Sequence, residues 1–453
     1  MAELVGRTRV TVVGGGLAGC EAAMQLARRG HDVVLLEMRP ARSTPAHRTD
    51  RLAELVCTNS FKSEDTANAH GLLKAEMRDL ESVLLAAAVE ARVPAGTALA
   101  VDRELFANAM TRRIEAEARI EVERAEATTL PAGPAIVATG PLTSDALTAE
   151  IAALLGNDGL AFFDAIAPII AADSIDETRV FRASRWGKGE GDDYINCPFS
   201  REEYEAFLNA LREADVYPGH DWENVPYFEG CLPIEVMASR GDDTLRFGPM
   251  KPIGLRDPRT DRRPYAVLQL RREDRAGQMW NMVGFQTRLR TGEQRRVFRT
   301  IPGLENAEFL RLGSIHRNTY LDFPARLNAY GAPPARPDLL FAGQLTGVEG
   351  YTESAASGIL AGINLHRIVT GQEPVLPPPT TMIGALYRYL RDARPTEFQP
   401  MNSNFGLLEP LPEHVRDKAA RRARLVERAR ADFAEWAERY ARADAVPAET
   451  GRG

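Results

Sequence analysis

The 453-residue sequence predicts an α/β fold in which a parallel sheet, built from both ends of the chain, is interrupted by an inserted α+β domain. Three observations predict it. The first forty residues show the pattern strand, glycine-rich turn, helix, strand, and a second strand–glycine–helix unit lies near residue 340. The stretch between them is rich in short strands, aromatic residues and arginines. We expect one domain from residues 1–160 and 330–453, with residues 161–329 inserted.

A glycine-rich loop follows the first predicted strand, a β-branched run at residues 10–13, and precedes a helical pattern at 20–29. In the G-x-G-x-x-G pattern the first glycine permits a tight turn, the second lets the backbone approach a pyrophosphate, and the third lets the helix pack on the strand. The helix N-terminus then offers unpaired N–H groups to phosphates. The loop residues are Gly14, Gly15, Gly16, Leu17, Ala18 and Gly19.

An acidic residue ends the second predicted strand, residues 32–36. Glu37 lies 23 residues after Gly14 and is placed to accept hydrogen bonds from the ribose hydroxyls of an adenosine. The glycine pattern alone is weak evidence, but here it stands in the full context of strand, turn, helix, strand and acid. The unit therefore predicts dinucleotide binding.

Two later segments favour FAD over NAD. Residues 135–141 form an apolar strand ending in Ala-Thr-Gly, which is typical of FAD-binding proteins of the glutathione-reductase type, with Thr139 and Gly140 toward the cofactor. The sequence contains one complete G-x-G-x-x-G, so a second Rossmann domain for NAD(P)H is not expected.

The second segment is a late strand–glycine–helix unit. Its apolar strand at 339–343 is followed by a small-residue helix at 354–362. In the glutathione-reductase fold such a unit reaches the flavin, and its helix N-terminus stabilises negative charge on the reduced ring. The candidate flavin-binding residues are Gly343, Gln344 and Gly347.

The insertion and the C-terminal region show further local patterns. Residues 244–248, 265–270 and 279–285 are predicted strands of a sheet in the insertion. The prolines between 374 and 379 interrupt the chain after the late helix. Residues 413–440 are predicted to be helical, with inward positions at Leu425, Phe433, Trp436 and Tyr440.

The composition, 44% hydrophobic and 26% charged residues, is that of a globular domain protein. No run of eighteen apolar residues predicts a membrane span, and the N-terminus has no signal-peptide pattern, so we expect a cytoplasmic protein. The four cysteines form no CxxC pair, so neither a zinc site nor a disulfide framework is expected. No stable protein partner is predicted.

The charge distribution leaves two interpretations open. A net charge of −7 counts against nucleic acid as a partner, yet residues 251–300 hold thirteen Lys or Arg against five Asp or Glu. A second basic stretch lies between residues 416 and 442. Such local patches can bind a phosphate backbone, and they can equally be solvated helix faces and interdomain ion pairs.

Eight blocks carry a family resemblance: residues 54–63, 69–77, 163–168, 227–236, 245–251, 312–318, 343–351 and 400–405. They resemble the folate- and FAD-dependent tRNA (uracil-5-)-methyltransferases, over residues 9 to about 410. The resemblance implies FAD as carrier of the methylene and the hydride, 5,10-methylenetetrahydrofolate as carbon donor and NAD(P)H as reductant. It also implies tRNA as partner, with methylation of uridine 54 in the T loop.

Other readings stay open beside this one. Larger FAD proteins that modify the wobble uridine share the fold, but they carry a histidine in the glycine loop and an extra C-terminal helical domain. Here the loop is Gly-Gly-Gly-Leu-Ala-Gly and the sequence has 453 residues, which favours the T-loop enzyme. The same chemistry on a ribosomal RNA uridine, a small-molecule flavin oxidoreductase and a non-enzymatic RNA-binding flavoprotein are the alternatives.

The expected chemistry requires thiols. A thiolate added to uracil C6 turns C5 into a nucleophile toward a methylene carbon, and cysteine suits this because it leaves readily afterwards. Cys57 and Cys231 match cysteines that the family uses in catalysis. We expect Cys231 to add to C6 and Cys57 to act on the flavin side, although the two roles could be exchanged. Lys62 and Lys251 are neighbouring cations that could activate a thiol, or solvated lysines.

The remaining candidates have structural or binding roles. Cys20 and Cys197 are expected to be buried packing residues, and His70 and His316 structural histidines. Glu349 is either a ligand of substrate or cofactor or a structural carboxylate. We further hypothesise that arginines within residues 256–299 bind tRNA phosphates, while Tyr227 and Phe228 hold the extruded base.

Overall fold

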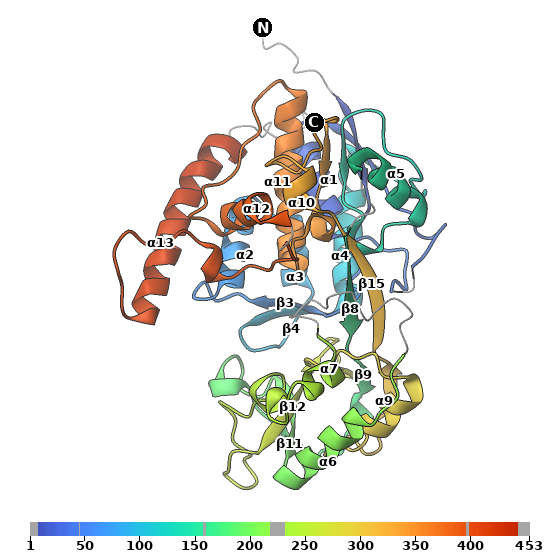
Figure 1. The fold of residues 1–453 in the computed structure, drawn as a ribbon, viewed down its shortest axis with the longest axis vertical. Coiled ribbons are helices and arrows are strands. Elements are labelled where there is room, and N and C mark those ends of the chain that lie inside the picture. The colour runs from blue at the N-terminus through green and yellow to red at the C-terminus, as the bar shows by residue number, and fades with distance from the viewer. Residues whose placement is uncertain (1–7, 45, 157–159, 218–231, 396–397, 443–453) are drawn as a thin grey trace, which may run out of the picture.

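The computed structural model describes residues 8–44, 46–156, 160–217, 232–395 and 398–442, without the side chains of 160–166, 314–319 and 442. Figure 1 shows two lobes: the N-terminal and C-terminal parts of the chain together form the upper one, and the middle of the chain forms the lower one. The predicted arrangement, a Rossmann-type domain built from both ends with an α+β insertion, is confirmed.

A five-stranded parallel sheet is the centre of the upper lobe. Each neighbouring pair is parallel; the strand at one edge comes from the C-terminal part of the sequence, and the other four come from its N-terminal part. The strands are short and β-branched, and most of their side chains are buried because helices cover both faces. In spatial order they are β16 (Leu339–Phe341), β7 (Ala135–Val137), β1 (Arg9–Val13), β2 (Asp32–Leu36) and β6 (Ile120–Glu123).

Two helices from opposite ends of the chain pack against one another on this sheet: α1 (Leu17–Arg28) and α11 (Tyr351–Val369). Small residues allow their close approach. A Cβ atom on Gly358 would overlap the carbonyl oxygen of Ala18, and one on Gly362 would lie 2.8 Å from Cβ of Gln25. The glycines therefore set the distance between the two helices, which side chains at these positions would increase.

Further helices surround this pair. Glu21 of α1 is buried and accepts a hydrogen bond from the amide of Leu84 (3.0 Å), which ties α1 to α3. A three-stranded sheet lies below the helices in Figure 1. These elements are α2 (Ala69–Asp79), α3 (Val83–Glu90), α4 (Arg103–Glu115), α5 (Asp145–Leu155), β3 (Ser60–Ser63), β4 (Arg92–Val93) and β5 (Ala98–Val101).

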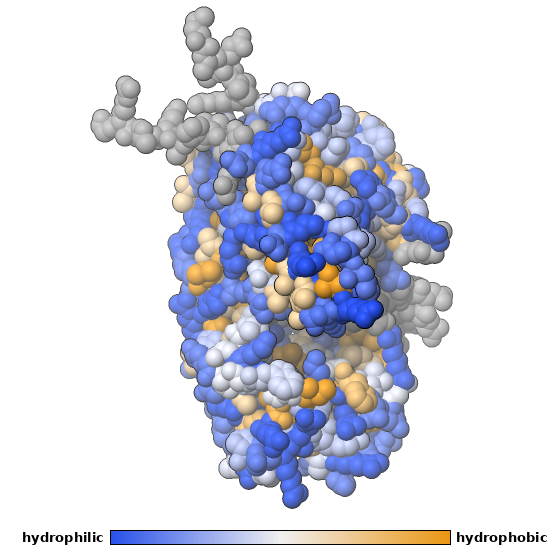
Figure 2. All heavy atoms as spheres, turned by 90° about the vertical axis from the view of Figure 1, so that its left-hand side faces the viewer, coloured by the Kyte–Doolittle hydropathy of each residue, from blue (hydrophilic) through white to orange (hydrophobic). Residues whose placement is uncertain are grey.

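The C-terminal part adds α10 (Phe323–Arg326), α12 (Met382–Asp392) and α13 (Lys418–Trp436). Of the predicted inward positions, Leu425, Phe433 and Trp436 are buried and Tyr440 is half-buried against the same core. Arg430 pairs with Asp79 of α2 at 2.7 Å. Figure 2, viewed from the α13 side, shows a mostly hydrophilic face with small, separate apolar groups. We conclude that α13 buries one stripe and presents the rest to solvent.

Two antiparallel strands, β8 (Leu160–Ile166) and β15 (Ser314–Tyr320), lead into and out of the lower lobe. That lobe has a six-stranded antiparallel sheet covered by helices, with an aromatic core that includes Phe207, Phe285 and Phe298. The sheet order is β10 (Phe181–Arg182), β11 (Tyr194–Phe199), β12 (Ala266–Arg272), β13 (Met279–Met282), β9 (Ile169–Ala171) and β14 (Phe309–Arg311). The helices are α6 (Arg201–Arg212), α7 (Ile234–Ser239), α8 (Thr244–Phe247) and α9 (Thr291–Phe298).

One predicted strand is wrong. Residues 244–248 were expected to be extended, but Thr244–Phe247 forms the short helix α8. Only Leu245 of this turn is fully buried, and Phe247 is 73% exposed. A single buried side chain per turn is what a helical turn supplies, whereas a strand would have buried alternate residues. The domain boundaries at 160 and 329 stay a prediction, to which the paired strands β8 and β15 lend support.

Among the helices that the structure describes, we find none with both the length and the apolar composition needed to cross a bilayer.

The close helix contact generates a stability prediction. Gly358→Ala should lower the free energy of unfolding by about 1–3 kcal/mol, because the new methyl group meets the backbone of α1, which cannot yield as a side chain would. Gly292→Ala, at an exposed helical glycine of α9 with open space around it, is the matched control. It should be neutral or slightly stabilising, since alanine is the better helix former. Equal thermal unfolding curves for the two variants would contradict the packing argument.

Candidate active site

The glycine-rich loop has the geometry of a phosphate cradle. Gly14 has φ = 104°, and a Cβ atom there would lie 2.6 Å from the carbonyl oxygen of Ala138. A Cβ on Gly19 would overlap the carbonyl oxygen of Gly14, whereas one on Gly16 would meet no atom within 4 Å. The first bond of α1 runs from the amide of Cys20 to the Gly16 carbonyl, so the preceding amides of the helix have no partner within it. Open space beside free amides is what a pyrophosphate requires.

Glu37 ends β2 beside this loop, as the sequence predicts. Its carboxylate accepts hydrogen bonds from the amide of Gly15 (3.1 Å) and from Nε of Arg39 (2.8 Å). Burial acts to raise the pKa of the Glu37 carboxyl group. The hydrogen bond and the charge of Arg39 lower it by more, so the pKa lies below its ordinary value. The carboxylate is therefore ionised and held in place. Sequence reasoning missed Arg39, although its position two residues after the acid was a signal.

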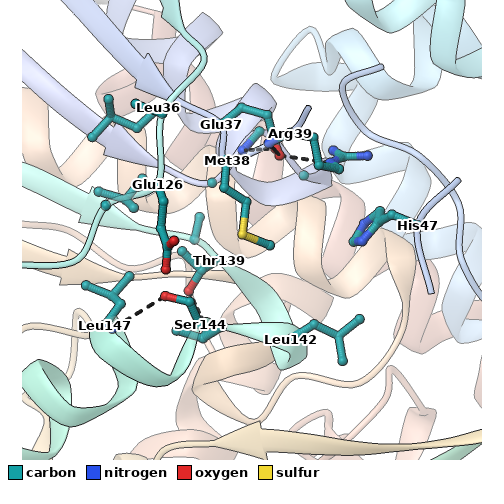
Figure 3. A pocket seen from close by; sticks show the side chains of 18 residues that line it. Leu36, Glu37, Met38, Arg39, His47, Glu126, Thr139, Leu142, Ser144 and Leu147 are labelled. Carbon is teal, nitrogen blue, oxygen red and sulfur yellow. Dashed lines mark hydrogen bonds and ion pairs between the residues drawn. The ribbon is translucent and has the colours of Figure 1, made fainter. Parts of the chain in front are cut away.

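A pocket lies between the loop, the end of β2 and the segment that follows β7 (Figure 3). Glu37, Met38, Thr139 and Ser144 line it, and the glycine loop closes one side. Gly140, the other predicted residue of this segment, begins a short 3-10 turn with φ = 68°. The pocket thus combines a ribose acceptor, free amides and apolar walls, which fit the adenosine diphosphate half of a dinucleotide such as FAD.

The late unit begins directly after β16. The amide of Gly343 donates to Oγ of Ser357 (2.7 Å), and Nε2 of Gln344 donates to Glu349 (2.7 Å). Glu349 thus has a structural partner and is buried. Gly347 has φ = 89° and packs over Phe398. α11 then begins at Tyr351 without a side-chain cap, so its N-terminal amides have no partner within the helix and are free to face an electronegative group.

The loop that contains Cys57 lies against this helix N-terminus. The amides of Cys57 and Thr58 donate to Oη of Tyr351 at 2.8 and 3.1 Å. Burial, followed by the neighbouring Cys57, raises the pKa of Tyr351 well above its usual range, so its hydroxyl stays protonated. Tyr351 therefore links the Cys57 loop to α11, the helix whose N-terminus the sequence analysis expects to reach the flavin.

Three arginines from elsewhere in the chain contact the same loop. Arg103 of α4 donates to the carbonyl oxygens of Leu55 (2.7 Å) and Cys57 (3.2 Å). Two arginines of the lower lobe reach across to it: Arg271 donates to Oγ1 of Thr58 (2.7 Å) and Arg311 to the carbonyl oxygen of Val56 (2.9 Å). The Cys57 loop is thus held from both lobes. Sequence reasoning missed Arg103 and Arg311 because they lie far along the chain, and it assigned Arg271, within residues 256–299, to phosphate binding instead.

The charge around this loop is only partly compensated. Glu273 pairs with Arg103 at 2.7 Å. Burial lowers the pKa of Arg271, and burial together with the charges of Arg103 and Arg48 lowers the pKa of Arg311 to about 10. All three guanidinium groups remain protonated at neutral pH, so the site is electropositive.

The other cysteines are placed differently. Cys20 and Cys197 are fully buried, and burial raises the pKa of each thiol far above its usual range. Both are therefore inert packing residues, as expected. Cys57 is partly exposed. Cys231, Tyr227 and Phe228 lie outside the residues that the structure describes.

The remaining predicted residues are distributed around the site. Nδ1 of His70 shares one hydrogen bond with Oγ of Ser403 (2.7 Å) and lies 3.2 Å from the carboxylate of Glu353 in α11. Burial raises the pKa of Glu353, but His70 and the other nearby donors and cations lower it far more, so the group is an ionised structural carboxylate. Lys62 is half-buried and Lys251 is exposed. The side chain of His316 lies outside the described residues.

The fold and this site define a dinucleotide-binding protein of the FAD-binding Rossmann class. A family model described as "Glucose inhibited division protein A" matches residues 9–373, and the chain belongs to that family. Within it, the chain belongs with proteins named methylenetetrahydrofolate--tRNA-(uracil-5-)-methyltransferase TrmFO. It is 58% identical over 428 residues to the one from Geobacter sulfurreducens, covering 94% of this chain and 98% of that protein.

Other comparisons agree. The protein of the same name from Pelotomaculum thermopropionicum is 56% identical over 419 residues, which is 92% of this chain and 95% of that protein. The solved structure of Aquifex aeolicus GidA superposes with a TM-score of 0.66 at 18% identity, covering 96% of this chain and 74% of that chain. The structural likeness supports the fold, and the sequence identity supports the narrower family.

The cradle geometry generates a prediction for cofactor binding. Gly16→Ala should leave folding intact, since the new methyl group meets no protein atom, yet it should lower FAD affinity at least about tenfold by occupying the space of the pyrophosphate. The measurement is a fluorescence titration of the apoprotein with FAD, with circular dichroism as the test of folding. Gly133→Ala, at an exposed loop glycine with open space around it, is the control. Unchanged FAD affinity in Gly16→Ala would place the pyrophosphate elsewhere.

Proposed function

We propose that this chain is a folate- and FAD-dependent methyltransferase that methylates C5 of uridine 54 in the T loop of tRNA. 5,10-Methylenetetrahydrofolate is the carbon donor and NAD(P)H the reductant. The observation that supports this most is the position of Cys57: a partly exposed cysteine on a loop bonded to Tyr351 at the N-terminus of α11, the helix that we propose faces the flavin. The sequence identity to proteins named for this reaction supports the substrate and the donor.

FAD, when bound and reduced by NAD(P)H, would supply the hydride that reduces the transferred carbon. The residues of the chain do the rest. One thiolate adds to uracil C6 and makes C5 nucleophilic; after C5 bonds to the donated carbon, a base removes the C5 proton and the thiolate leaves C6. We assign the addition to Cys231 and the proton transfer or shielding at the flavin side to Cys57. The placement of Cys57 beside Tyr351 supports the second assignment.

The site also suits an anionic macromolecular substrate. Three guanidinium groups contact the Cys57 loop and a single carboxylate, Glu273, pairs with them among the described residues. A small-molecule flavin oxidoreductase has no need of such a surplus. The two-lobed arrangement, with arginines of the insertion reaching the loop of the FAD-binding lobe, supports a substrate that enters between the lobes.

The hypothesis that arginines at 256–299 bind phosphates needs refinement. Arg271 is buried between the lobes, and Arg259 pairs with Asp257 at 2.6 Å. Arg288 is half-buried with Nε 3.7 Å from Glu235. Arg290 is exposed, with its guanidinium group 5.9 Å from the ring centre of Tyr217. We therefore propose the exposed members of the stretch, Arg290 first, as phosphate contacts.

The reaction is tested by tritium release from a T-arm RNA labelled at uridine C5. Release should require both 5,10-methylenetetrahydrofolate and NADPH, and Cys231→Ala and Cys57→Ala should each lower it by about a hundredfold or more, as loss of a group used in the chemical step does. Cys197→Ala, which removes an inert buried thiol, is the matched control and should retain activity per folded molecule. Release without folate, or full activity in Cys57→Ala, would contradict the proposal.

The phosphate contact is tested separately. Arg290→Ala should weaken tRNA binding and lower the slope of log K against log salt by about one, as the loss of one phosphate contact requires. Arg201→Ala is the control, because this exposed arginine pairs with Glu205 within α6 at the far end of the lower lobe. An unchanged slope in Arg290→Ala would remove this residue from the tRNA surface.

A further inference from the structure

Arg311 occupies a special position in the insertion. It ends β14, an edge strand of the six-stranded sheet, and its side chain leaves that lobe to donate from Nη2 to the carbonyl oxygen of Val56 (2.9 Å). This bond places the guanidinium group one residue from Cys57. Within the described part of the chain, its Nε and Nη1 groups have no hydrogen-bond acceptor and no carboxylate lies within ion-pair distance.

The charge of Arg311 is therefore uncompensated by any described carboxylate while its side chain is half-buried. Burial is the largest cause of its lowered pKa of about 10, and the neighbouring Arg103 and Arg48 add to it. The group is still protonated at neutral pH, so a full positive charge is held between the lobes beside two others. Arg103 has Glu273 and Arg271 has the side chains of Thr58 and Asn59, but Arg311 has a single backbone oxygen. A charge held this way is costly unless an anion joins it.

We propose that Arg311 binds a phosphate adjoining the target uridine, once that nucleotide has been extruded into the site. The inference rests on the proposed function. A guanidinium fork with two free N–H directions matches two phosphate oxygens. Its anchoring to Val56 fixes the phosphate relative to the Cys57 loop, so Arg311 is a positioning residue: it sets where the base lies when the thiols act.

The geometry favours a phosphate over a carboxylate of the folate. In a nucleotide the phosphate is one sugar away from the base, so a phosphate must come close to the reacting carbon whenever the base does. In a folate the glutamate carboxylates are separated from the pterin by an aromatic ring and an amide, so they lie far from the transferred carbon. Arg311 bonds to the residue before Cys57, so its place suits the short separation of phosphate and base in a nucleotide better than the long one in a folate. An extruded base also needs a phosphate anchor to offset its lost stacking.

A double-mutant cycle between protein and RNA tests this. T-arm RNA hairpins carry an uncharged methylphosphonate in place of the phosphate on the 5′ or the 3′ side of the target uridine. With wild-type holoenzyme, one of the two replacements should weaken binding about tenfold, the loss expected for one charged hydrogen-bonded contact. Arg311→Gln should bind unmodified RNA about tenfold more weakly and lose no further affinity on that replacement, since paired groups are non-additive.

Three readouts separate this role from a structural one. Arg311→Lys keeps the charge and should retain the salt slope of wild type, while Arg311→Gln lowers it by about one. FAD content and the KM for 5,10-methylenetetrahydrofolate should be the same in all variants. Arg201→Gln, at the first residue of α6, is the control and should behave as wild type in every RNA.

Two results would overturn the inference. Additive losses in the cycle would show that Arg311 and the phosphate do not meet. A raised KM for the folate with unchanged RNA affinity would assign Arg311 to the glutamate carboxylates. Tritium release by the wild-type enzyme from the same hairpin tests the proposed function separately from the role of Arg311. If tritium is released but the losses in the cycle are additive, only the role of Arg311 is wrong. If no folate-dependent release occurs, the proposed function is wrong as well.

Discussion

The packing of α1 against α11 is the contact on which the rest of the site depends. The two helices come from opposite ends of the chain, and Gly358 lets them approach until the second helix touches the backbone of the first at Ala18. Because both begin beside strands of one parallel sheet, their N-termini lie at the same carboxyl edge. One N-terminus faces the space beside Gly16, where a pyrophosphate fits, and the other carries Tyr351. We therefore propose that a dinucleotide spanning the two runs from the Glu37 pocket toward the Cys57 loop.

The Cys57 loop joins this scaffold to the insertion. Its amides are bonded to Tyr351, and its successive carbonyl groups accept hydrogen bonds from Arg103 and Arg311. Arginine suits this role because one guanidinium group can reach several carbonyl oxygens and stay charged when half-buried. The same residues that position the loop also make the space between the lobes electropositive. The same arginines therefore hold the Cys57 loop and attract an anionic substrate. A substitution that disturbs the position of the loop is expected to alter this attraction as well.

Much of the upper lobe was predictable because its signals are local. The run before Gly14, the glycine spacing and the acid at Glu37 all lie within forty residues, and the structure has β1, α1 and β2 as expected. The short segment at 244–248 failed as a strand because five residues carry too little periodicity to separate a strand from a helical turn, and in α8 only Leu245 is fully buried. The importance of Cys57 came from the family resemblance, and its surroundings did not come from sequence at all.

The sequence by itself determined the class of fold, the glycine-rich loop and the acid at the end of the second strand, because each depends on neighbouring residues and on backbone rules that hold in any protein. Only the tertiary structure decided which charges meet. Arg103, Arg271 and Arg311 come from three separate elements, and nothing in their local sequence distinguishes them from the exposed arginines of the same chain. Burial distinguishes them, and burial is a property of how distant segments pack, not of the order of residues along the chain.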